Sequence, residues 1–179
     1  MQIYKDCDFT VYGTDTELDK LVDSQYVDDR IEMARQKYGL NKLVNDEYEY
    51  VRVAVAEQGY GLDTLIKDED WHVREAVTRQ GYRLDELISD KDYRVVYATE
   101  EYLKANNYRS VFAWARDNDI NLDIDLWLHS EIKSERVQVA KEGYGLDKLI
   151  SDDYVKYYVE NYLEEHNYKS IKDWINDNR

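Results

Sequence analysis

A ten-residue phrase that returns at a fixed spacing constrains the fold of this chain more than any other feature. Three copies follow one another at equal intervals, and a fourth comes after a break; they begin at Lys37, Gly59, Gly81 and Gly143. Repetition with a period in the range of about 20 to 50 residues is typical of arrays built from one supersecondary unit. The sequence therefore predicts a fold made of stacked copies of one unit.

Each unit is predicted to hold one ordinary helix and one very short helix. Val51, Ala54 and Val55 have the i, i+3, i+4 spacing that places apolar side chains on one helical face. Gly59 follows this stretch and is predicted to end the helix in a left-handed conformation. The next apolar residues fit within one further helical turn, for which an aspartate is the predicted N-cap in three of the copies: Asp63, Asp85 and Asp147.

Stacking is required because one unit of about 22 residues cannot cover its own apolar stripe, whereas neighbouring units can bury a continuous core. This predicts an all-α solenoid. Asp46 and Asp68 stand six positions before two of the arginines that recur in register. We therefore expect an Asp–Arg ladder between adjacent repeats. The alternative is that these residues are separate surface charges that contribute little to stability. The recurring arginines are Arg30, Arg52, Arg74 and Arg136.

The segment 68–77, followed by Gly81 and the pair Leu84 and Leu87, resembles the leucine-rich repeat variant (LRV) family, a relative of the HEAT repeat. The resemblance covers about residues 24–103 and 130–152. It implies a right-handed superhelix in which α-helices alternate with short 3₁₀-like helices. The iron–sulfur member of that family carries a cysteine cluster that this sequence lacks, so the resemblance implies no cluster and no site residues here.

A second, longer duplication overlays the first, since residues 102–114 reappear sixty positions later as 162–174. In each copy a serine, Ser110 or Ser170, is the predicted N-cap of a helix that closes an array. The predicted organisation is an N-terminal cap at 1–23, a repeat array with its terminating helix at 24–119, and a shorter array with its own terminator at 120–179.

The first residues do not follow the repeat. Ile3, Cys7, Phe9 and Val11 alternate with polar residues, which favours a short strand or an irregular cap. One cysteine leaves no partner for an internal disulfide, the start of the chain lacks the pattern of a secretory signal, and there is no run of about 18 apolar residues. We therefore expect a cytoplasmic protein without a membrane partner.

The sequence offers little support for catalysis. The three histidines have no ligand or catalytic spacing, and there is no nucleophile elbow or phosphate-binding loop. Residues 117–125 superficially resemble a calcium loop, but Leu122 stands where the loop needs glycine and Leu128 where it needs glutamate. The prediction is a non-enzymatic protein with no cofactor and no metal.

Charge provides the main indication of function, because the chain has 39 acidic residues and only 24 basic ones, so that its net charge is −15. A repeat fold would align such acids in rows, which repel nucleic acid but could imitate its backbone. The leading hypothesis is an inhibitor or adaptor that docks on a basic, nucleic-acid-handling protein, such as a phage anti-CRISPR or other anti-defence factor; the alternative is that the charge serves only solubility. The acids predicted to contact the partner are Asp63, Asp68, Asp85, Asp90, Glu69 and Asp70.

Tyrosine is the other anomaly, with 18 copies against two phenylalanines. Tyrosines that share one repeat slot are more typical of packing, whereas aromatic residues at variable positions before the helices are the better contact candidates. These candidates are Tyr48, Tyr50, Trp71 and Tyr93. They also support a second hypothesis, a scaffold that binds a peptide or a helix on its concave face. The oligomeric state is left open by the sequence.

Overall fold

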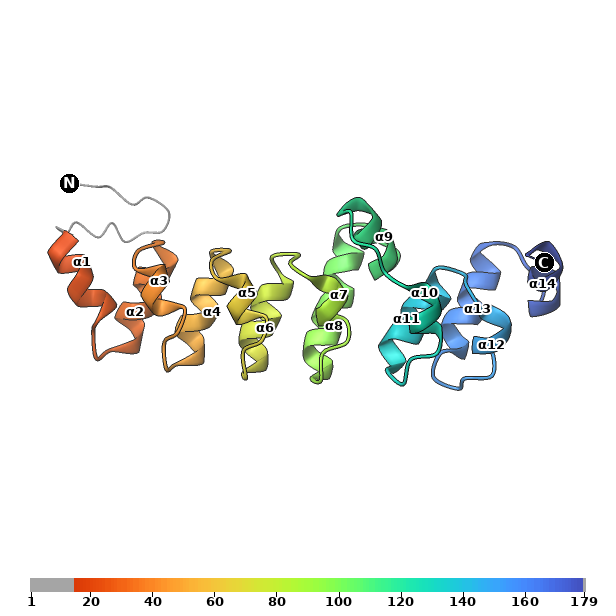
Figure 1. Ribbon diagram of the computed structural model, residues 1–179, viewed down its shortest axis with the longest axis horizontal. Helices are drawn as coiled ribbons and strands as arrows, with labels where there is room; N and C mark the ends of the chain where they lie inside the picture. The colour runs from red at the N-terminus through yellow and green to blue at the C-terminus, as the bar shows by residue number, and fades with distance from the viewer. Residues whose placement is uncertain (1–14, 179) are drawn as a thin grey trace. The chain divides into compact units, whose positions relative to one another are not determined.

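The computed structural model describes residues 15–178, which form fourteen helices and no strand (Figure 1). The all-α prediction is confirmed for this part of the chain. The strand or irregular cap predicted from Ile3 to Val11 lies outside the described residues. The helices are α1 (Asp15–Val22), α2 (Val27–Arg35), α3 (Leu40–Leu43), α4 (Glu49–Glu57), α5 (Leu62–Leu65), α6 (Trp71–Thr78), α7 (Leu84–Leu87), α8 (Tyr93–Ala105), α9 (Val111–Asp117), α10 (Ile124–Leu128), α11 (Lys133–Lys141), α12 (Leu146–Leu149), α13 (Lys156–Glu165) and α14 (Ile171–Asp177).

The chain divides into two compact units between Tyr82 and Arg83. In unit 1, α1 packs on α2, α2 on α4, and α4 on α6, while the short helices α3 and α5 connect them (Figure 1). The apolar stripe predicted for these helices is buried, because Val51 and Val55 of α4 and Val73 and Val77 of α6 have no exposed surface. Burial of such side chains is the main stabilising contribution to a helix stack of this kind.

Two glycines form the turn between α4 and α5. Gly59 has φ +71°, and its N–H donates to the carbonyl of Ala56 at 2.8 Å, which ends α4 with the predicted left-handed residue. Gly61, with φ +64°, is itself the N-cap of α5, and a Cβ on it would lie 2.5 Å from Cγ2 of Val44. The prediction that Asp63 caps this helix is therefore wrong, since Asp63 already lies within the helical turn.

The same correction applies at the other short helices for which an aspartate cap was predicted. Arg83 in a left-handed conformation precedes α7, so Asp85 is not its cap. Gly145 precedes α12 in the same conformation, so Asp147 is not its cap. The left-handed residue sets the direction of the chain at the start of these helices, and the aspartate two positions later lies inside the turn rather than before it.

Unit 2 contains the two duplicated segments. The predicted serine caps are confirmed, because Ser110 accepts a hydrogen bond from the N–H of Ala113 at 3.2 Å and Ser170 accepts one from that of Asp173 at 3.3 Å. The ring of Phe112 in α9 packs edge-on against Trp127 in α10, with 5.0 Å between centroids. Contacts thus cross residue 119, where the sequence predicts a boundary between two arrays.

Candidate interaction surface

A ladder of arginine–aspartate pairs holds the loops that precede the ordinary helices. Arg52 in α4 donates from Nε and Nη2 to the carboxylate of Asp68, at 2.7 and 2.9 Å. Its Nη1 also donates to the carbonyl of Asp46 at 2.7 Å. The predicted ladder is confirmed, although the carboxylate lies in the loop that follows the arginine and the preceding loop supplies only a carbonyl. Arg30 also pairs with Asp46, and Arg136 with Asp152.

These pairs stabilise the charged form of the arginines inside the fold. The hydrogen bond to Asp46 raises the pKa of Arg30 above its ordinary value and outweighs burial, which lowers it. The hydrogen bond to Asp68 raises the pKa of Arg52 in the same way. A bidentate pair of guanidinium and carboxylate is directional, so each rung fixes both the position and the orientation of a loop.

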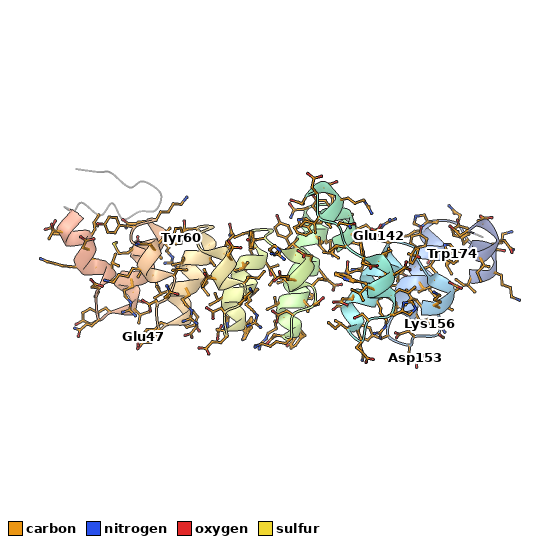
Figure 2. All side chains as sticks on the ribbon, viewed as in Figure 1. Glu47, Tyr60, Glu142, Asp153, Lys156 and Trp174 are labelled. Carbon is orange, nitrogen blue, oxygen red and sulfur yellow. The ribbon has the colours of Figure 1, made fainter. Side chains whose placement is uncertain are left out.

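In unit 1 these loops form one edge, which we call the loop edge: residues 24–28, 46–50 and 68–72, at the N-terminal ends of α2, α4 and α6 (Figure 1). Figure 2 labels Glu47 on this edge and Tyr60 on the opposite edge of the same unit. The side chain of Glu47 is 80% exposed. The loop edge is therefore an exposed surface whose loops are fixed by the arginine–aspartate ladder.

The predicted acidic residues of unit 1 have different surroundings. The carboxylate of Asp68 is engaged by Arg52, and Asp70 caps α6 by accepting from the N–H of His72 at 2.8 Å. Asp63 accepts a hydrogen bond from the hydroxyl of Tyr82. Glu69 is exposed. Of these four acids, Glu69 is therefore the one best placed to meet a partner.

In unit 2 the predicted acids are half-buried. Asp85 lies beside Arg83, with 3.6 Å between its Oδ1 and Nε of the arginine. Asp90 accepts a hydrogen bond from the N–H of Asp92 at 2.8 Å. Tyr93, the predicted aromatic contact of this unit, is 77% exposed at the start of α8, with the guanidinium of Arg94 5.8 Å from its ring centroid.

The structure brings the other aromatic candidates together on the loop edge of unit 1. Tyr48 and Tyr50 are exposed, and Trp71 is half-buried. The ring of His72 stacks on Trp71 with 3.6 Å between centroids, and its centroid lies 6.0 Å from that of Tyr50. Three of the predicted aromatic contact residues therefore share one surface.

Sequence reasoning missed two residues of this edge. Tyr26 is 65% exposed at the N-cap of α2, one repeat before Tyr48 at the N-cap of α4. The sequence assigned no role to His72, and its place between two aromatic rings was not predicted. The repeat register was the signal that could have found Tyr26, because it places both tyrosines at the same point of the unit.

A hollow of about 530 Å³ in unit 2 is lined by residues of α8, α11 and α13. Its charged groups are mixed, and Lys141 pairs there with Glu100 at 3.0 Å. Within residues 15–178, no group of three histidine, cysteine, aspartate or glutamate side chains is placed to hold a metal ion. None of the helices described in this part of the chain is long and apolar enough to cross a membrane.

Comparison of the chain with protein families, with characterised proteins and with solved structures gives no match.

Proposed function

We propose that this protein is a non-enzymatic acidic repeat protein that binds a basic nucleic-acid-handling protein and inhibits it by imitating nucleic acid. The observation that carries the proposal is the loop edge of unit 1, where exposed carboxylates such as Glu47 and Glu69 alternate with exposed aromatic rings. The net charge of −15 makes the protein negatively charged, as a nucleic acid is. Complementary charge accelerates association and makes it sensitive to salt.

The architecture we propose for this function is a right-handed α-solenoid of the LRV or HEAT-like kind. The packing of α2 on α4 and of α4 on α6, at intervals of one repeat, supports it within unit 1. Such a scaffold displays the same repeat position at regular intervals, as a nucleic acid displays its phosphates. The proposal places the protein in the cytoplasm and includes neither a cofactor nor direct binding to nucleic acid.

The acids that we expect to meet the partner differ in part from the predicted set. Asp68 serves the ladder, so its replacement would disturb the fold as well as any interface. Glu47 and Glu69 are exposed on the loop edge, as is Asp28 in the first turn of α2. Their replacement changes the surface charge with little effect on packing.

Affinity capture from cell lysate, at low and at high salt and with or without excess double-stranded DNA, tests the proposal. We expect a nucleic-acid-binding protein, such as a nuclease of a defence system, that is captured at low salt and displaced by DNA. The triple variant Glu47→Lys, Glu69→Lys, Asp28→Lys should lose it. A matched triple variant with the same change in charge at exposed positions elsewhere, Glu57→Lys, Asp147→Lys and Glu164→Lys, should retain it. Equal capture by both triple variants would contradict the proposed surface.

A second candidate function is a scaffold for a peptide or helix, which the exposed tyrosines of the loop edge favour. Tyr26, Tyr48 and Tyr50 offer contact area with few rotatable bonds. Binding of this kind should barely change with salt, whereas mimicry of nucleic acid should weaken steeply. The same capture experiment therefore separates the two functions.

A further inference from the structure

Building on the proposed docking surface, we propose that the loop edge of unit 1 recognises arginine side chains of the basic partner through an aromatic cluster formed by Tyr50, Trp71 and His72. The inference goes beyond charge mimicry because it names the chemical group that is read and predicts a preference for arginine over lysine.

The geometry of the cluster leaves one aromatic ring open. The ring of His72 stacks on that of Trp71 with an interplanar angle of 29°. The backbone N–H of His72 donates a hydrogen bond to the carboxylate of Asp70 at the start of α6. The tilted ring of Tyr50, from the neighbouring helix α4, is 54% exposed. Tyr50 therefore offers a ring to a group that approaches from solvent.

Carboxylates precede two rings of the cluster along the chain. Glu49 immediately precedes Tyr50 at the start of α4, and Glu69 precedes Trp71 by two positions. A planar cation that stacks on an aromatic ring can donate hydrogen bonds from its edge to carboxylates beside the ring. A guanidinium matches both requirements, whereas an ammonium acts as a compact and strongly hydrated point charge.

The protein already holds one of its own guanidinium groups in this way on the same edge. The guanidinium of Arg30 lies 5.4 Å from the ring centroid of Tyr48, and its Nη2 is 4.0 Å from Oε1 of Glu47. Two hydrogen bonds join it to Asp46. One repeat unit thus shows an arginine between an aromatic ring and carboxylates, and Tyr50 presents an open ring on the same loop.

Fluorescence anisotropy with two labelled synthetic peptides tests this inference, using the full chain. One peptide is rich in arginine, and the other has lysine at every arginine position. We expect the arginine peptide to bind about fivefold more tightly, as one exposed cation–π contact would give. Tyr50→Ala should abolish this preference, and Tyr50→Phe should retain it because the ring remains.

Tyr60→Ala is the matched control, since Tyr60 is 40% exposed on the opposite edge of unit 1 (Figure 2). Circular dichroism confirms that each variant is folded. Equal affinity for the two peptides, a preference that survives Tyr50→Ala, or no binding of either peptide would overturn arginine recognition. If both peptides bind equally and both are lost with Glu47→Lys and Glu69→Lys, acidic docking stands while arginine recognition fails.

Discussion

The carboxylate of Asp68 accepts two hydrogen bonds from the guanidinium of Arg52 and a third from the N–H of Asp70, at 2.9 Å. The side chains of Arg52 and Asp68 are only 11% and 9% exposed. This pair connects α4 to the loop that carries Glu69 and Trp71. The stability of unit 1 and the shape of its loop edge therefore depend on the same contact.

Removal of this carboxylate should destabilise the protein strongly. Asp68→Ala leaves the guanidinium of Arg52 largely buried without its counter-ion, so we expect the free energy of unfolding to fall by about 3 kcal/mol. Glu69→Ala, one position away on the exposed surface, should change it by less than about 0.5 kcal/mol. Urea unfolding followed by circular dichroism measures both, and similar losses for the two variants would show that the ladder does not stabilise the fold.

The two glycines between α4 and α5 should respond differently to alanine. Both have positive φ, so each substitution strains the backbone by about 1 kcal/mol. Only at Gly61 would the new Cβ also meet Val44, whereas at Gly59 the nearest atom would be 3.8 Å away. We expect Gly61→Ala to cost about 1 to 2 kcal/mol more than Gly59→Ala in thermal or urea unfolding. Equal costs would mean that Val44 moves aside freely.

The buried side-chain amide of Gln138 should protect the backbone N–H of Val111, at the start of α9, from hydrogen exchange. Its Oε1 accepts a hydrogen bond from the N–H of Val111 at 3.0 Å, and Gln138 has no exposed surface. Gln138→Leu leaves that N–H without its partner, at a cost of about 1 to 3 kcal/mol. Hydrogen exchange followed by NMR should show faster exchange at Val111. The N–H of Ala113, which donates to Ser110, is the internal reference, and an unchanged ratio of the two rates would contradict the assigned role.

Acid should weaken unit 2 through Asp152. Burial opposes ionisation of this carboxyl group, but hydrogen bonds from Arg136 and from the N–H of Tyr154 outweigh it and lower its pKa below the ordinary value. Because the pKa is lower in the folded state, the stabilisation is present above the unfolded value of about 4 and is lost as the pH falls through the folded value. Urea unfolding as a function of pH should show a smaller loss between about pH 5 and pH 2 for Asp152→Asn than for the wild type. Parallel curves would exclude this contribution.

The sequence predicted the recurring ladder but not the recurring caps of the short helices, and it missed contacts that occur once. The register of Arg30, Arg52 and Arg136 was sufficient to predict a ladder, because the same contact is made in successive repeats. Its connectivity was not predictable from spacing alone. The loop places the carbonyl of Asp46 near Arg52, and the carboxylate of Asp68 reaches back from the following loop.

Contacts made by a single residue had no such signal. Gln138 occupies the repeat slot held by Ala54 and Ala76, and nothing in the spacing shows that its amide would meet the start of α9. The cluster of Tyr50, Trp71 and His72 was found only in part, since it depends on how the first turns of α4 and α6 lie side by side. Variable positions of a repeat carry local contacts that the periodic pattern does not encode.

The constant separation within the ladder also governs how such a gene can change in length. Each rung is encoded by an arginine and by an aspartate 16 positions later, a separation that is the same for Arg30, Arg52 and Arg136. Duplication of one whole block in frame, such as the stretch from Arg30 to the residue before Arg52, therefore supplies both halves of a new rung. An insertion between one of these arginines and its aspartate would lengthen the separation of 16 positions, so growth by complete blocks is the course that keeps these guanidinium groups paired.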